Sequence, residues 1–112
     1  MNEPFVYAKD CNLESVSEGV KRKILAYGDE LMAVEVHFEK DAVGPLHSHP
    51  HTQVSYVLEG AFEFEINGVT RIVKKGDTLY KSPNLVHGCK CTEKGILLDL
   101  FTPYREDFIK NK

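Results

Sequence analysis

Histidines mark the part of this sequence that could bind a metal ion. His47, His49 and His51 alternate along one short segment, and His87 follows a Ser-Pro-Asn turn. Alternate residues of a strand point to the same face, so a His-x-His pair on a strand presents two imidazoles side by side. Gln53 continues the same alternation and carries a carbonyl oxygen. Imidazole nitrogens and an oxygen that converge from two segments are typical of a site for one divalent metal ion.

The alternation alone does not decide which of two histidine pairs binds the metal ion. If His49 and His51 were the pair, the residue four positions further on would be Ser55, which is a poor ligand. If His47 and His49 are the pair, that residue is Gln53. We therefore expect a metal site made of four residues, with His51 at its rim or behind its ligands. The expected ligands are His47, His49, Gln53 and His87.

The expected ligand set also says something about the ion. Three imidazoles and one amide oxygen suit Ni, Mn, Fe, Co or Zn, and the sequence does not select among these metals. They leave one or two coordination positions free, as catalytic sites do. A neutral amide adds no negative charge, so the ion would stay a stronger Lewis acid than it would beside a carboxylate.

A second group that could do chemistry is a carboxylate inside the apolar segment from residue 95 to residue 102. Asp99 shares its alternation with Phe101, so both side chains are expected on one face of a strand. A buried carboxylate is costly unless it is paired or functional. Asp99 is therefore either the partner of some Arg or Lys, or a residue with a function of its own. Arg105 could hold an anionic substrate, or it could be a surface residue that pairs with Glu106 or Asp107.

The segments that would position these residues have period-two patterns. Phe62 and Phe64, for example, alternate with Glu63, as in a half-buried strand. Asn67-Gly68 predicts the type I′ turn of a hairpin. Helix is scarce, with a turn or two expected in residues 4–17 and after Tyr104. Strands are expected at residues 31–38, 53–58, 61–66, 69–73, 78–81, 87–91 and 96–102. This pattern predicts an all-β sandwich or barrel, whose interior can hold one small ligand.

Composition and charge exclude several classes of function. The chain has 112 residues, enough for one domain, and a net charge of −3 with acidic and basic residues interspersed. The sequence has no cluster of Lys and Arg of the kind that binds nucleic acid, so we expect no nucleic-acid partner. The N-terminal residues do not resemble a secretory signal, and the apolar run at residues 96–101 is too short to span a bilayer. We expect a cytoplasmic protein with no membrane partner. Cys11, Cys89 and Cys91 are expected to be small, half-buried strand residues.

Two motifs resemble those of the cupin superfamily. Residues 44–60, with H-x-H-x₃-Q-x₆-G, resemble the first cupin motif, and residues 76–87, with G-D-x₅-P-x₃-H, resemble the second. The first motif usually has Glu where this sequence has Gln53. The resemblance implies one cupin-type β-barrel, a double-stranded β-helix of the jelly-roll class. We expect the barrel at residues 31–112, with residues 1–30 as an N-terminal extension whose strands pack on it. Barrels of this size often bury an edge strand in a dimer, so we expect this chain to form a homodimer.

Three segments resemble the pectin-degradation cupins more closely. They are HSHPHTQVSYVLEG, KKGDTLYKSPNLVHG and LLDLFTPYREDF, within residues 31–108. That family linearises 4,5-unsaturated uronates from pectin or alginate to open-chain keto-uronates. By position, Asp99, Phe101 and Arg105 fall on the active-site Asp, Phe and Arg of the family, and Gln53 falls on its metal-binding Gln.

The resemblance to these cupins implies a metal-dependent isomerase for a small anionic sugar. Asp99 and Arg105 would be the catalytic residues, with Asp99 as the base, while Phe101 and Arg105 would bind the substrate. Whether the sugar comes from pectin or from alginate remains undecided. Other cupins are dioxygenases, sugar isomerases or non-catalytic binding proteins. Oxygen uptake would distinguish a dioxygenase from a uronate enzyme.

Overall fold

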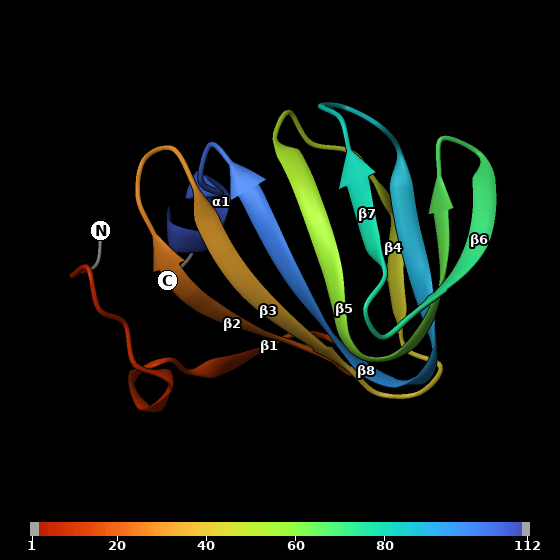
Figure 1. Cartoon of the computed structure of the whole chain (residues 1–112), viewed down its shortest axis with the longest axis horizontal. Helices are drawn as coiled ribbons and strands as arrows, with labels where there is room; N and C mark the ends of the chain where they lie inside the picture. Colours follow the sequence, from red (N-terminus) through yellow and green to blue (C-terminus); the bar gives the residue numbers. More distant parts are fainter. Residues whose placement is uncertain (1–2, 111–112) are drawn as a thin grey trace.

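The computed structural model describes residues 3–110, and it is built almost entirely of antiparallel strands (Figure 1). The strands are β1 (Leu13–Ser17), β2 (Val20–Tyr27), β3 (Met32–Phe38), β4 (Val43–His47), β5 (Thr52–Ile66), β6 (Val69–Lys74), β7 (Thr78–Lys81) and β8 (His87–Thr102). A short 3₁₀ helix, η1 (Ala8–Asp10), precedes them, and the helix α1 (Glu106–Lys110) follows them. None of the helices among residues 3–110 is long and apolar enough to cross a membrane.

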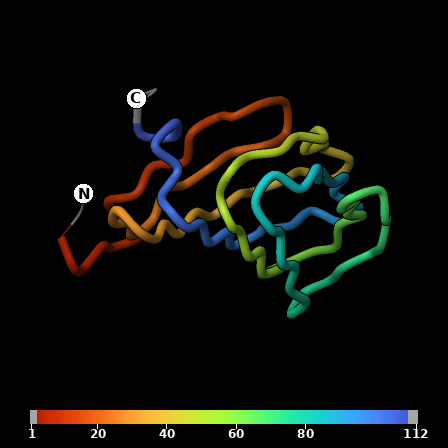
Figure 2. Tube along the Cα trace, turned by 90° about the horizontal axis from the view of Figure 1, so that it is seen from above, coloured from red at the N-terminus to blue at the C-terminus, as the bar shows by residue number. Residues whose placement is uncertain are grey.

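Two long strands, β5 and β8, belong to both sheets of the fold. Their register pairs residues 52–57 of β5 with residues 97–102 of β8, and residues 61–66 of β5 with residues 87–93 of β8. One sheet therefore has the order β1-β2-β3-β8-β5-β7, and the other has the order β4-β8-β5-β6. The two sheets face each other across a common interior (Figure 1), and the trace from β4 to β8 winds around it (Figure 2). This is the jelly-roll barrel that the sequence predicts.

Glycines allow β5 and β8 to change sheet where they cross. Gly60 has a φ of 79°, and the register of β5 against β8 shifts around it. A Cβ atom on Gly60 would lie closer than 3.0 Å to the backbone of residues 93–95, and one on Gly95 would meet the carbonyl oxygen of Glu59. The backbones can approach this closely only because neither residue has a side chain.

Several predicted elements differ from those observed. Residues 53–58 and 61–66 were expected as two strands, but they form the single strand β5, because Glu59-Gly60 makes a bulge instead of a turn. Residues 87–91 and 96–102 likewise join in β8. The helical turn expected in residues 4–17 covers only η1, and β1 occupies the end of that segment. The expected Asn67-Gly68 turn is confirmed, with φ values of 50° and 82°.

The apolar core fills both ends of the interior. Phe62 and Phe38 pack edge to face, with ring centroids 5.2 Å apart, in the larger cluster. Met32, Val34 and Phe101 form a second cluster under α1. Phe62 and Phe64 are buried while Glu63 is exposed, which confirms the alternation predicted for this strand. The face of β8 that carries Phe101 also carries Asp99, one of the buried polar residues.

Candidate metal centre and cavity

Six buried side chains in residues 3–110 are polar or charged, and they lie on β5, β7 and β8 and in the connection between β4 and β5. Water does not solvate these groups, so each needs a partner or a function. They are His49, Gln53, Ser55, Lys81, His87 and Asp99.

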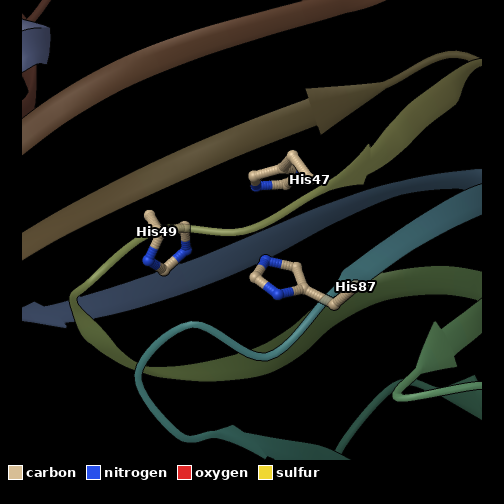
Figure 3. A group of neighbouring side chains, drawn as sticks. All are labelled: His47, His49 and His87. Atoms are coloured by element: carbon tan, nitrogen blue, oxygen red, sulfur yellow. The ribbon is translucent and has the colours of Figure 1, made fainter.

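Three histidines from three different segments face one another (Figure 3). His47 ends β4, His49 lies in the connection to β5, and His87 begins β8. One ring nitrogen of each lies within 4.8 Å of those of the other two. The ring centroids of His47 and His87 are 4.4 Å apart, and those of His49 and His87 are 5.1 Å apart. The expected convergence of these three residues is therefore observed.

The convergence has a different cause from the one that the sequence pattern suggested. Residues 48–51 form no strand, so His47 and His49 are not neighbours on one pleated face. Pro50 lacks the N–H that a strand ladder needs. The backbone N–H of Asn84, in the connection between β7 and β8, donates to the carbonyl of His49 at 2.7 Å. That hydrogen bond ties the loop of His49 to the segment that leads to His87.

Backbone carbonyls determine which nitrogen two of these histidines present. His47 Nδ1 lies 2.9 Å from the carbonyl oxygen of Pro45, and His87 Nδ1 lies 3.0 Å from that of Leu85. A carbonyl oxygen only accepts, so each Nδ1 carries the hydrogen and each Nε2 keeps a free lone pair. Metal-binding histidines are commonly oriented in this way.

Burial keeps two of these histidines, His49 and His87, neutral. Desolvation, followed by the charge of Lys81, lowers the pKa of His87 to about 3. Desolvation, followed by the charge of Arg105, also lowers the pKa of His49 below its ordinary value. A neutral imidazole is the form that binds a metal ion, so this environment favours binding at neutral pH.

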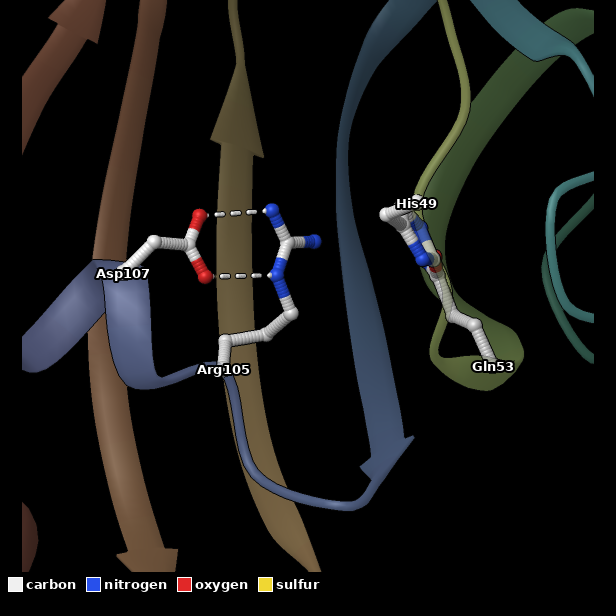
Figure 4. A network of polar contacts seen from close by, with 4 residues as sticks. All are labelled: His49, Gln53, Arg105 and Asp107. Carbon is white, nitrogen blue, oxygen red and sulfur yellow. Dashed lines mark hydrogen bonds and ion pairs between the residues drawn. The ribbon is translucent and has the colours of Figure 1, made fainter.

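Gln53 lies beside the three histidines at the start of β5. Its Oε1 atom is 2.9 Å from His49 Nε2, and the two side chains lie together in Figure 4. Two ligands at right angles around an ion, each at about 2.1 Å, would be separated by about 3 Å. His49 Nδ1 is also buried without a hydrogen-bond partner among the described residues. The residues present therefore fit one divalent ion, with Gln53 as the expected fourth ligand.

His51 lies outside the group of three histidines in the described residues. Its ring centroid is 5.4 Å from that of His49 and 6.3 Å from that of Phe101. Burial lowers its pKa, and the charge of Arg105 adds to this effect. The structure therefore places His51 behind His49, next to Phe101.

A cavity of about 240 Å³ opens from this centre toward α1. His47, Gln53 and His87 line it, and so does the aromatic ring of Phe101. Its charged lining residues are one carboxylate and three cations, namely Asp99, Arg22, Lys81 and Arg105. The excess of positive charge, to which a divalent ion would add, favours a small anionic ligand.

Asp99 and Arg105 both line this cavity, and each has a protein partner. The Ser55 hydroxyl donates to Asp99 Oδ1 at 2.6 Å. Arg105 donates from Nε and Nη2 to the two carboxylate oxygens of Asp107 at 3.0 and 2.9 Å (Figure 4). The alternative pairing with Asp107 is therefore present, although Arg105 is not a surface residue, because its side chain is only 12% exposed. Its guanidinium also lies 5.0 Å from the ring centroid of Phe101.

Sequence reasoning missed three polar residues of the cavity region. Ser55 was considered only as a metal ligand, although it shares the alternation of Gln53 and hydrogen-bonds to it. Lys81 ends a correctly predicted strand, but its place opposite Gln53 follows from strand pairing, which the sequence does not reveal. Arg22 lies on β2, with its guanidinium 3.9 Å from the ring centroid of Phe108 and with a buried Nε that has no partner among the described residues.

Comparison with known proteins shows the same fold in close relatives. The chain is 45% identical over 98 residues to the pectin degradation protein KdgF of Dickeya dadantii (strain 3937), covering 86% of this chain and 89% of that protein. The crystal structure of an RmlC-like cupin from Shewanella frigidimarina NCIMB 400 matches with a TM-score of 0.92 and 42% identity, over 96% of both chains. The structure of KdgF from Halomonas sp. matches with a TM-score of 0.90 and 37% identity, over 96% of this chain and 99% of that one.

The match to a protein family covers the same strands as the site. Residues 34–101 match the cupin domain family. This range contains the three clustered histidines, Gln53 and Asp99, and it ends at Phe101. The protein is therefore a member of the cupin family and a relative of the pectin degradation proteins KdgF.

Proposed function

We propose that this protein linearises 4,5-unsaturated uronate monosaccharides to open-chain keto-uronates with the help of one divalent metal ion. The observation that carries the proposal is a single cavity that joins a three-histidine cluster to one buried carboxylate and three cations. The 45% identity to a pectin degradation protein makes sugars from pectin breakdown the first substrates to test.

Two of the three cations, Arg105 and Arg22, would bind the carboxylate of the sugar. The ion pair with Asp107 fixes the plane of the Arg105 guanidinium and leaves its remaining N–H donors for a ligand. Arg22 contributes a second guanidinium to the same end of the cavity. Phe101 lies between Arg105 and His49 and would form an apolar wall against one face of the sugar ring.

The metal ion would be held by His47, His49 and His87, with the Oε1 atom of Gln53 as the fourth donor. When bound, it would supply a Lewis acid that stabilises negative charge on oxygen atoms of the substrate. Because the four donors are neutral, none of them offsets the charge of the ion. Ni, Mn, Fe, Co and Zn all suit such a set.

Asp99 would carry out the proton transfer. In the cyclic sugar, C1 bears a hydroxyl and is joined to C5 through the ring oxygen. Removal of the C1 hydroxyl proton forms the aldehyde, and the bond from C1 to the ring oxygen breaks. The electron pair stays on that oxygen as an enolate at C5, which becomes a ketone when C4 takes up a proton. Asp99 is the carboxylate among the residues that line the cavity, so it is our candidate for the base and for the return of the proton.

Proton NMR of a freshly prepared unsaturated uronate tests this proposal. Adding the metal-loaded protein should convert the signals of the vinyl C4 proton and of the anomeric proton into those of the open-chain product, without uptake of oxygen. Oxygen consumption with a different product would instead indicate a dioxygenase, and it would contradict the proposal.

A further inference from the structure

The hydroxyl of Ser55 joins three polar side chains in the interior. Ser55 is fully buried on β5. Its Oγ atom lies 3.1 Å from Gln53 Nε2, 2.9 Å from Lys81 Nζ and 2.6 Å from Asp99 Oδ1. Strand pairing explains the meeting, because Ser55 is opposite Asp99 on β8 and Gln53 is opposite Lys81 on β7. One hydroxyl therefore connects the expected metal ligand to the expected base.

The chemistry of these groups allows one direction for each hydrogen bond. A hydroxyl has one hydrogen and two lone pairs. The Lys81 ammonium and the Gln53 NH₂ group can only donate, so they occupy both lone pairs. The hydroxyl hydrogen must then go to Asp99 Oδ1. With its NH₂ group on Ser55, Gln53 turns its carbonyl oxygen toward His49, which is the orientation that a metal ligand needs.

Burial of the Lys81 ammonium at this position costs free energy. Lys81 is only 2% exposed, and a buried ammonium loses its hydration. Two features offset this cost, namely the carboxylate of Asp99 on the other side of the Ser55 hydroxyl and the ring of Phe64, whose centroid lies 4.6 Å from Nζ. An apolar side chain would fill the same inward position of β7 without that cost. The arrangement therefore points to a role for the charge.

We propose that Ser55 and Lys81 are positioning residues, which hold Gln53 and Asp99 as one unit. Lys81 fixes the hydroxyl of Ser55, and that hydroxyl fixes both the metal-facing oxygen of Gln53 and the carboxylate of Asp99. Asp99 Oδ2 is then left to face the substrate. The part that concerns Asp99 rests on the proposed function, whereas the part that concerns Gln53 does not.

Two variants separate this role from a merely structural one. Lys81→Met removes the ammonium but keeps an unbranched chain that suits a buried strand, and Ser55→Ala removes the hydroxyl. Lys75→Met and Ser15→Ala are matched controls at exposed positions. The first readout is the visible spectrum of the cobalt(II)-loaded protein, which reports the ligands of the ion. Both test variants should shift this spectrum, and both controls should leave it unchanged.

The second readout is steady-state kinetics with the unsaturated uronate as substrate, in which the effect on kcat is compared with the effect on KM. Both test variants should lower kcat, by up to about 10²-fold for a misplaced group, and should leave KM within about twofold. Wild-type spectra and wild-type kcat in Lys81→Met would overturn the proposal, and so would a higher KM with an unchanged kcat, which would make Lys81 a substrate-binding residue. Shifted spectra in a protein without uronate activity would support the Gln53 part and refute the proposed function. If Ser55→Ala does not fold, the spectrum and the kinetics of Lys81→Met alone test the proposal.

Discussion

Arg105 and Asp107 form a two-point ion pair at the edge of the cavity, with N–O distances of 3.0 and 2.9 Å. The hydrogen bonds from Arg105 lower the pKa of Asp107, so the carboxylate stays charged. Arg105 also lies over Phe101 and Phe108, at 5.0 and 4.2 Å from their ring centroids. Asp107 thus orients the guanidinium that we expect to bind the substrate.

This pairing predicts the effect of Asp107→Ala. Loss of the partner should loosen Arg105 and raise KM several-fold while kcat changes little, because the carboxylate of the substrate is present before the chemical step. Arg105→Ala should raise KM further. Since Asp107 acts through Arg105, the double variant should resemble Arg105→Ala in steady-state kinetics. Effects of the two substitutions that simply add would show that Asp107 acts independently.

The histidine cluster predicts the metal content of the protein. Elemental analysis of wild-type protein should find close to one divalent ion per chain, and His49→Ala or His87→Ala should abolish it. His37→Ala is the matched control, because His37 pairs with Glu35 on β3, is not part of the three-histidine cluster and should not affect the ion. Full metal retention in both site variants would refute the ligand assignment.

Gln53→Glu tests whether the amide is a ligand. A carboxylate in its place adds a negative charge next to the ion, so the metal affinity measured by titration calorimetry should rise. Turnover should fall, because the added charge weakens the Lewis acid. If affinity and turnover both stay at their wild-type values, Gln53 does not reach the ion.

The low pKa values of His49 and His87 predict how the stability of the metal-free protein depends on pH. Both groups stay neutral in the folded state, with His87 neutral down to about pH 3, but become protonated near pH 6.5 in the unfolded state. The unfolded state therefore binds more protons, and the free energy of unfolding should fall as the pH drops from about 7 to 4. Urea unfolding checks this, and the fall should be smaller in His87→Asn than in the wild type. An equal fall in the variant would contradict the burial effect.

The sequence predicted the cupin barrel because hairpin signals and both histidine motifs depend on local patterns. The confirmed Asn67-Gly68 turn and the strand at residues 78–81 are examples. The prediction divided each of the long strands β5 and β8 into two. A glycine at a bulge inside a bent strand gives the same local sequence pattern as a glycine in a turn between two strands. The three histidines were found by their spacing, although the geometry that unites them comes from a loop.

The polar network around Ser55 could not be predicted from the sequence. Lys81 and Asp99 are 18 residues apart along the chain, and they meet because β5 pairs with β7 on one side and with β8 on the other. A lysine at the end of a strand normally indicates an exposed position, whereas Lys81 is buried. Only the three-dimensional pairing shows that its charge lies in the cavity.

The most direct test of the proposed function follows the near-ultraviolet absorbance of the unsaturated uronate, which ring opening and ketonisation abolish. Metal-loaded wild-type protein, added to freshly lyase-digested pectate or alginate, should speed the loss of absorbance well beyond the spontaneous rate. Asp99→Ala should keep its metal and its fold but lose most of the acceleration, by roughly 10²–10⁴-fold for a general base. A spontaneous rate left unchanged by the wild-type protein on both digests would contradict the account.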